Sequence, residues 1–250
     1  MSPIAVTSRN PRSLLIFSKP KVGKTELLAQ LPDSLLLDTE KGSEFVAAQK
    51  LVVNSIADIR EVGEAVFAAG NPYKRVGIDT VTSLEELCIS YAEEIYASTP
   101  MGKNWFQQNA AGEWTGGKAN YKTIIGLPDG AGYNYLRQAM EKALNYIKSW
   151  APETILVGHV KDTQLEKNGA VFNSLDLDLT GKLKRIVSSQ CDAIGYLYRK
   201  GNQNILSFKT TDDIACGARP LHLRDQEIVV SEIDKATGVV TTHWDRIYID

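Results

Sequence analysis

The sequence predicts an α/β fold whose central sheet is mostly parallel. Four short apolar segments have the length and composition of buried strands, and helical patterns separate them along the chain. These segments are Ser13–Phe17, Ser34–Asp38, Arg75–Asp79 and Thr154–Gly158. Because neighbouring parallel strands need a crossover that usually contains a helix, this alternation favours a parallel α/β sheet.

Helical patterns fill most of the intervals between these strands. Ser55 is the predicted N-cap of a helix that extends to Ala69, after which Gly70, Asn71 and Pro72 end it. The other expected helices are Lys24–Gln30, a short one near Glu44–Gln49, an amphipathic one through Leu84, Leu87, Tyr91 and Ile95, and a long one over Tyr133–Trp150.

The last quarter of the chain predicts a C-terminal β-hairpin extension. Turn residues at 201–202 and 236–238 separate strand-like segments in this region. These segments are Ala193–Tyr198, Ile205–Lys209, Ile228–Val230 and Val239–His243. Without an internal repeat or a composition break, residues 1–250 are expected to form one domain, with 99–131 as an insertion loop.

Composition excludes several functional classes. The chain has 250 residues, of which 43% are hydrophobic, 28 are basic and 30 are acidic, so it lacks a chain-wide positive field for nucleic acid. Its three cysteines are widely spaced and form neither a CxxC metal pattern nor a disulfide framework. No apolar run reaches the ~20 residues that span a bilayer, and the N-terminal segment lacks a signal-peptide core. A cytoplasmic protein without a membrane partner is expected.

A phosphate-binding loop lies between the first strand and the first helix. Residues 18–25 read S-K-P-K-V-G-K-T, which lacks only the first glycine of the pattern G-x-x-x-x-G-K-S/T. Backbone N–H groups at a helix N-terminus cradle phosphate oxygens, and the lysine reaches the β- and γ-phosphates. The nucleotide-binding residues are expected to be Ser18, Lys19, Pro20, Lys21, Val22, Gly23, Lys24, Thr25 and Glu26.

Acidic residues follow two further strands where Mg²⁺ and a reacting water would lie. Asp79 ends its strand at the Walker B position and, with the Thr25 hydroxyl, is the expected Mg²⁺ ligand. Glu40 follows Asp38 and is the expected catalytic base that polarises the attacking water. A helix-capping role for Asp79 and a solvated loop position for Glu40 are the structural alternatives.

Three short motifs occur in the order found in RecA-fold ATPases. They are LLLDTE at 35–40, GIDT at 77–80 and ILVGH at 155–159. Over residues 13–231 the chain resembles the short RecA-like nucleotide-binding proteins of phages, some of which act as single-strand annealing recombinases. The resemblance implies a RecA-like P-loop core that lacks the extra terminal domains of RecA.

The same resemblance implies roles for residues outside the loop. His159 would be a polar sensor of the γ-phosphate, although a histidine satisfied at a strand end is the ordinary alternative. Lys209 and Arg219 match, loosely, the region that supplies basic catalytic residues to a neighbouring protomer, and both could equally be surface cations. A homo-oligomer is therefore expected.

Two stretches are candidates for contact with single-stranded DNA. Residues 99–131 mix aromatic and basic side chains, which suit base stacking and phosphate contact, or pack a small satellite core. A second stretch, Val160–Arg185, follows the sensor strand, where the resemblance to RecA-like proteins implies a DNA-contacting loop. A helix with solvated lysines is the alternative for Gly181–Ser188. The expected DNA-binding residues are Lys103, Trp105, Phe106, Trp114, Lys118, Lys122, Lys161 and Lys167.

The expected function is a Mg²⁺- and ATP-dependent ATPase that binds single-stranded DNA and supports annealing or recombination. A single-strand-binding protein is one expected partner, and a phage source would place the protein in the host cytoplasm. One alternative is an ATP-dependent scaffold or loader for replication proteins. The other is a P-loop kinase, which the absence of an arginine-rich lid disfavours.

Overall fold

The computed structural model describes residues 9–40, 50–167, 170–211 and 214–249. The expected short helix near Glu44–Gln49 lies outside these residues. The chain forms two compact units that interleave in sequence. Unit 1 comprises Met1–Val52, Tyr73–Val81 and Ala151–Asp250, and unit 2 comprises Val53–Pro72 and Thr82–Trp150. The single-domain expectation stays a prediction.

Unit 1 contains one sheet with the strand order β11-β10-β8-β7-β1-β5-β4-β2-β3. The six strands from β7 to β3 in this order pair in parallel, and β8, β10 and β11 continue the sheet in antiparallel pairing. The α/β fold with a mostly parallel sheet and a C-terminal hairpin extension is therefore confirmed. Its strands are β1 Ser13–Ser18, β2 Ser34–Asp38, β3 Lys50–Val52, β4 Arg75–Asp79, β5 Glu153–Lys167, β6 Ala170–Leu177, β7 Ala193–Lys200, β8 Gln203–Ser207, β9 Gly217–Ala218, β10 Glu227–Ile233 and β11 Val240–Thr242.

Apolar side chains hold the sheet of unit 1 together. All six residues of β1 are buried, as expected for a central strand covered on both faces. Leu27 and Leu28 of helix α1 (Lys24–Ala29) pack in the same cluster as Leu14, Ile16 and Trp244. The other helices of this unit are α6 Leu183–Ser189 and the 3₁₀ turn η3 Trp244–Arg246. The first helix is therefore fixed directly behind the loop that it follows.

The register of the parallel strands brings their carboxyl ends together. Ser18 of β1 pairs with His159 of β5, and Asp38 of β2 pairs with Asp79 of β4. The β5 strand lies between β1 and β4, so His159 comes between the phosphate loop and Asp79. This edge carries the candidate site.

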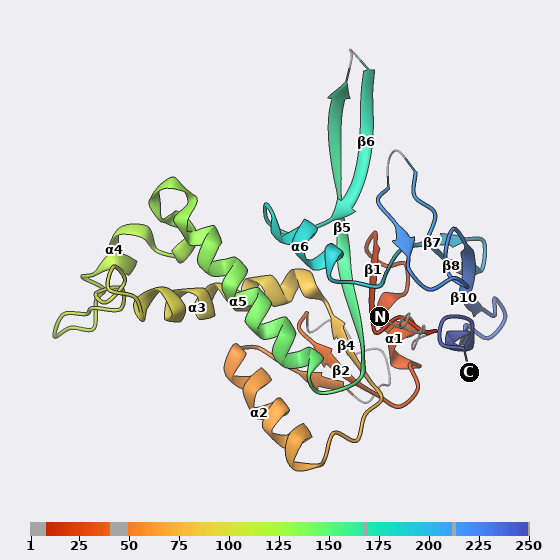
Figure 1. Ribbon diagram of the computed structural model, residues 1–250, viewed down its shortest axis with the longest axis horizontal. Coiled ribbons are helices and arrows are strands. Elements are labelled where there is room, and N and C mark those ends of the chain that lie inside the picture. The colour runs from red at the N-terminus through yellow and green to blue at the C-terminus, as the bar shows by residue number, and fades with distance from the viewer. Residues whose placement is uncertain (1–8, 41–49, 168–169, 212–213, 250) are drawn as a thin grey trace, which may run out of the picture. The chain divides into compact units, whose positions relative to one another are not determined.

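One expectation about β5 is wrong. Val160–Arg185 was expected to form a loop, but β5 continues to Lys167 and pairs antiparallel with β6, from Val160 opposite Leu177 to Lys167 opposite Ala170. Figure 1 shows this pair as a two-stranded ribbon that extends beyond the rest of the sheet of unit 1. A helix near the end of the stretch, α6, agrees with the sequence.

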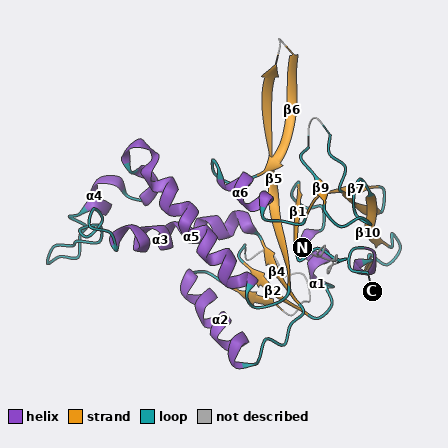
Figure 2. Ribbon diagram, in the orientation of Figure 1, coloured by secondary structure: helices purple, strands orange, loops and turns teal. Residues whose placement is uncertain are grey.

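Unit 2 is helical (Figure 2). Helices α2 and α5 contact through the Tyr146 hydroxyl, which donates to the Arg60 carbonyl at 3.3 Å. Helices α3 and α5 contact through Cys88 and Met140, and burial raises the pKa of the Cys88 thiol to about 12. The elements are α2 Ile56–Ala68, α3 Val81–Ala97, α4 Gly117–Tyr121, α5 Ala131–Lys148 and the turns η1 Ile124–Gly126 and η2 Pro128–Gly130. No helix among the described residues is long and apolar enough to cross a membrane.

Candidate functional site

The phosphate loop joins the end of β1 to the start of α1. Gly23 is the helix N-cap and has φ of 105°, a left-handed conformation that favours glycine. A Cβ atom at Gly23 would also lie 3.1 Å from the Asn204 side chain and 3.4 Å from the Arg199 guanidinium. Ser18, which replaces the usual first glycine, ends β1 with a φ that is not positive, so its side chain adds no left-handed strain.

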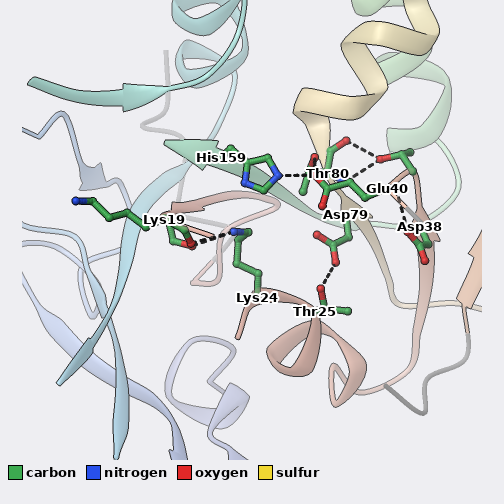
Figure 3. A network of polar contacts seen from close by, with 10 residues as sticks. Lys19, Lys24, Thr25, Asp38, Glu40, Asp79, Thr80 and His159 are labelled. Carbon is green, nitrogen blue, oxygen red and sulfur yellow. Dashed lines mark hydrogen bonds and ion pairs between the residues drawn. The ribbon is translucent and has the colours of Figure 1, made fainter. Parts of the chain in front are cut away.

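Lys24 lies inside the loop with its ammonium group on loop oxygens. Its Nζ donates to the Ser18 hydroxyl and to the Lys19 carbonyl, both at 3.2 Å. Lys24 is 7% exposed, and this desolvation lowers the Lys24 pKa, whereas the negative charges of Asp79 and Glu40 act to raise it. The Lys19 side chain points away from Lys24 and lies 3.9 Å from Asp162 (Figure 3).

Thr25 and Asp79 meet at the start of α1. The Thr25 hydroxyl donates to Asp79 Oδ2 at 2.7 Å. Burial is the largest influence on Asp79 and raises its pKa, while the bond from Thr25 opposes that rise. The two oxygens suit a hard cation, and among the described residues no three His, Cys, Asp or Glu side chains form a metal cluster. Mg²⁺ would therefore be held by these two residues together with phosphate oxygens, as this ion usually is.

Glu40, two residues after β2, is held by Thr80, which directly follows β4, and by His159 of β5. Its Oε1 accepts from the Thr80 hydroxyl at 2.7 Å and lies 2.5 Å from His159 Nε2 (Figure 3). The Glu40 backbone N–H donates to Asp38 Oδ1 at 3.1 Å. The carboxylate is thereby oriented toward the same edge as Lys24 and Asp79.

Thr39 and Thr80, which sequence reasoning did not select, fix the backbone beside Glu40. The Thr39 hydroxyl donates to the Thr80 carbonyl at 2.8 Å and accepts from the Thr80 N–H at 2.7 Å. The peptide between Asp79 and Thr80 is cis. Both threonines follow acidic residues at strand ends, and this pattern, Asp-Thr at 38–39 and 79–80, was the available signal.

Arg199 of β7 is a second residue that the sequence did not indicate. Its Nη2 donates to the Val22 carbonyl of the loop at 2.9 Å, and its Nε donates to Asn204 Oδ1 at 3.0 Å. Asn204 in turn donates to the Ser231 hydroxyl at 2.9 Å, and both residues are buried. The arginine is thus anchored on β8 and β10 and placed against the phosphate loop.

These groups line one cavity of about 510 Å³. Its polar wall includes the cations Lys24 and Arg199 and the acids Glu40 and Asp79, and its far wall comes from the hairpin of β10 and β11. A cavity of this size suits a small ligand. The lining residues are Pro20, Lys21, Gly23, Lys24, Thr25, Glu26, Glu40, Asp79, His159, Arg199, Ile233, Gly238 and Val240.

Lys209 and Arg219 do not line this cavity. Lys209 Nζ lies 3.6 Å from Glu227, and Arg219 Nη1 donates to Asp192 at 2.9 Å. Both side chains are exposed by about half or more, so their role toward a neighbouring protomer stays a prediction.

Trp105 cannot be a stacking platform for DNA, which corrects one expectation. It is 1% exposed and packs edge-on against Tyr96 and parallel to Tyr121 within unit 2. Sequence composition could not show which aromatic residue of the insertion fills its core.

Phe106 and Trp114 are the aromatic residues of the expected DNA surface that remain open. Each is 40% exposed, and their ring centroids lie 5.9 Å apart. Lys118 Nζ lies 5.3 Å from both rings and forms a 2.6 Å ion pair with Glu93, which reduces the charge it offers to a phosphate. Lys103 and Lys122 are exposed.

The other two expected DNA-binding lysines, Lys161 and Lys167, belong to the β5–β6 ribbon. Lys161 lies 3.8 Å from Asp178. The Lys167 side chain lies outside the described residues.

Comparison with known proteins gives a match to a protein family and similarities to solved structures, of which one is described here. A family model described as an AAA domain matches residues 10–219 of this chain. The KaiC-like protein of the hyperthermophilic archaeon Pyrococcus horikoshii OT3 has a TM-score of 0.43 and 10% identity, over 93% of this chain and 89% of that chain. A similarity of this degree carries no functional argument. No curated protein matches the chain.

Proposed function

Because the chain belongs to the AAA domain family of P-loop ATPases, we propose that it hydrolyses ATP with Mg²⁺ in the cavity described above. We further propose that it binds single-stranded DNA and supports annealing or recombination. The observation that carries the nucleotide part is the convergence of Lys24, Thr25, Asp79 and Glu40 at one sheet edge.

The residues of the cavity have different roles in phosphoryl transfer to water. Backbone N–H groups around Gly23 bind phosphate oxygens, and Lys24 leaves the Ser18 and Lys19 oxygens to bind the terminal phosphates. Thr25 and Asp79 would hold Mg²⁺, which would supply positive charge next to the phosphates. Glu40 accepts a proton from water as the water oxygen bonds to the γ-phosphorus and the bond to ADP breaks.

His159 supports a link between nucleotide and the β5–β6 ribbon. It contacts the catalytic carboxylate at 2.5 Å and stands directly before Val160, where β5 begins to pair with β6. When a γ-phosphate competes with Glu40 for His159, this contact must change. His159 and the β5–β6 ribbon belong to the same strand, so a change at His159 would be transmitted to the ribbon. The ribbon is therefore the proposed element that responds to the bound nucleotide.

The DNA part of the proposal rests on exposed aromatic and basic side chains of unit 2. Phe106 and Trp114 offer ring faces for base stacking, and Lys103 and Lys122 offer cations for phosphates. Lys209 and Arg219 lie outside the cavity of their own chain, as residues that act on a neighbour's nucleotide must. We therefore include a homo-oligomer and, as a partner, a single-strand-binding protein in the proposal.

The experiment measures ATP hydrolysis with and without single-stranded oligothymidylate. Wild type should be stimulated, and the Phe106→Ala/Trp114→Ala variant should lose about 10-fold or more in DNA affinity, since each stacked base contributes ~1–3 kcal/mol. Phe67→Ala, which removes another exposed aromatic ring of unit 2, is the matched control and should bind like wild type. Hydrolysis that DNA never changes, with no DNA bound, contradicts the recombination function. It favours an ATP-dependent scaffold or loader for replication proteins.

A further inference from the structure

A second cavity of unit 1, of about 830 Å³, is lined by four arginines. Arg9 and Arg12 come from the segment before β1, and Arg219 and Arg224 come from the segment that follows β9. The two pairs are more than 200 residues apart in sequence, and the sheet brings them together. The chain as a whole has a net charge of −2, so this is a local concentration of positive charge.

This cavity lies at the opposite edge of the sheet from the phosphate loop. Arg12 directly precedes β1 and Asp192 directly precedes β7, and these two strands are parallel. The phosphate loop follows the other end of β1, after six residues. At ~3.3 Å per residue the strand separates the two cavities by roughly 17 Å. A ligand here would not compete with a nucleotide at Lys24.

One carboxylate faces these arginines among the described residues that line the cavity. Asp192 accepts from the backbone N–H groups of Arg12 and Ser13 at 3.0 and 3.3 Å, and from Arg219 Nη1 at 2.9 Å. Arg224 Nη2 donates to the Arg219 carbonyl at 3.1 Å, which positions its guanidinium without neutralising it. The ion pair of Asp192 is with Arg219, and among the described residues no carboxylate lies within ion-pair distance of Arg12 or Arg224.

The lining chemistry fits phosphate groups. Guanidinium groups bind phosphate oxygens through two parallel N–H bonds, which a lysine cannot do. The described lining has no Phe, Tyr or Trp ring that could hold a base, and its apolar part is Pro220, Leu221 and Ile249, with Leu221 79% exposed. A strand would present successive phosphates to several of these cations and lay its sugars on the apolar groups.

We propose that this arginine-lined cavity binds the phosphate backbone of a single nucleic acid strand, independently of ATP and of base sequence. The identity of the strand rests on the proposed function, while the phosphate chemistry rests on the cavity alone. Because the contacts are to phosphates, binding must weaken as salt is raised.

Fluorescence anisotropy with a labelled 20-nucleotide oligothymidylate tests the proposal on the full-length protein without nucleotide. The comparison is between wild type, Arg12→Ala, Arg224→Ala and the double variant. Each lost phosphate contact lowers the slope of log K against log salt by about 0.7 for a single strand, which is about fivefold in affinity at 0.1 M salt. The double variant should lose about 25-fold.

Three comparisons make the result specific. Arg137→Ala removes a half-buried arginine from α5 of unit 2 and should bind like wild type. Lys24→Ala should still bind the strand, and excess Mg²⁺-ATP should not displace it from wild type. Circular dichroism and thermal melting establish that the arginine variants remain folded.

The outcomes distinguish the arginine-lined site from DNA binding elsewhere on the protein. Wild-type affinity and salt slope in the double variant overturn the arginine site while leaving DNA binding by the protein intact. A wild type that binds no strand with or without ATP contradicts the DNA part of the proposed function as well. A third outcome is that pyrophosphate binds Lys24→Ala in calorimetry, that this binding requires Arg12 and Arg224, and that no strand binds. This outcome assigns the cavity to a free phosphate compound and overturns the proposal that it binds a strand.

Discussion

At the scale of single residues, the site contains two buried ionisable groups of opposite charge, Asp79 and Lys24. Each is 7% exposed. Burial raises the pKa of Asp79 and lowers the pKa of Lys24, so it favours the neutral form of both side chains. The folded pKa of Asp79 lies above its unfolded value, so folding favours the protonated carboxyl. Stability from this group is present below the unfolded pKa and is lost as pH rises through the raised folded pKa.

Asp79→Asn should therefore separate folding from metal binding. The amide keeps the shape without a buried negative charge, so at pH 7 the nucleotide-free variant should melt no more than about 2–4 °C below wild type, equivalent to ~1 kcal/mol. The rise in Tm that Mg²⁺-ATP gives wild type should be absent, because a metal ligand is lost. Differential scanning calorimetry with Mg²⁺-ATP or EDTA measures both effects.

The pH dependence supplies the control for that variant. Mg²⁺ must displace the proton of Asp79, so the rise in Tm that Mg²⁺-ATP gives wild type should become smaller as pH falls. Because the pKa of Asp79 is raised, this decrease should begin at a higher pH than it would for a carboxyl of ordinary pKa. A full Mg²⁺-ATP shift in Asp79→Asn would show that the metal is held elsewhere.

Arg199 is expected to contribute to nucleotide affinity by fixing the phosphate loop. Arg199→Ala removes the charge-assisted bonds to Val22 and Asn204 and should weaken ATP binding about 10- to 100-fold, equivalent to ~1.4–2.8 kcal/mol. Arg199→Lys should restore little, because an ammonium cannot make both bonds with a planar fork. Titration with a fluorescent ATP analogue measures the change.

Lys200→Ala is the control for Arg199. The next residue of β7 points to the other face of the sheet and is exposed, so its loss should leave affinity within about twofold. Equal affinities for Arg199→Ala and wild type would remove the arginine from the site.

The residues of the phosphate loop could be predicted from sequence because their spacing is local. Lys24, Thr25 and Gly23 lie within three positions, and Asp79 and Glu40 each follow an apolar strand. Arg199 could not be predicted, because its contact with Val22 spans 177 positions and depends on β7 lying beside β1. Trp105 and Trp114 look alike in sequence, and only packing separates the buried ring from the exposed one.

At the scale of elements, the start of α2 shows how local sequence determines a boundary. The Ser55 hydroxyl accepts from the Asp58 N–H at 3.1 Å, and Asp58 Oδ2 accepts from the Asn54 N–H at 2.7 Å. These bonds satisfy donors that the first turn leaves unpaired, and they hold the pKa of Asp58 below its usual value.

Ser55→Ala should cost about 1 kcal/mol of unfolding free energy and lower Tm by about 2–4 °C. ATP hydrolysis should be unchanged, since Ser55 lies outside the nucleotide cavity. Ser90→Ala is the matched control, because the Ser90 hydroxyl bonds the Leu87 carbonyl inside α3 and caps no terminus. Thermal melting that shows equal losses for both serines would contradict the capping role.

The β5–β6 ribbon was missed for a physical reason. Residues 160–167 read V-K-D-T-Q-L-E-K, in which apolar and polar residues do not alternate as they do in a half-buried strand. A ribbon formed by pairing alone leaves no hydrophobic pattern for sequence to reveal. The buried strands β1, β2 and β4 carry that pattern, and their predicted bounds agree with the structure to within one residue.

At the scale of the whole chain, the strand order determines where chemistry can occur. The β5 strand between β1 and β4 leaves room at their carboxyl ends for a nucleotide, with His159 between Lys24 and Asp79. The antiparallel strands β10 and β11 then supply a wall of the same cavity. This second contribution comes from the last 25 residues and could not be anticipated from the P-loop alone.

The central claim is that ATP is hydrolysed in this cavity with Glu40 as the base. Its most direct test is the steady-state rate of phosphate release from Mg²⁺-ATP by wild type, Lys24→Ala and Glu40→Gln, with single-stranded DNA present. Lys24→Ala should abolish turnover, and Glu40→Gln should lower the rate about 10²- to 10⁴-fold while retaining ATP binding. A Glu40→Gln variant that hydrolyses ATP at the wild-type rate would contradict the claim.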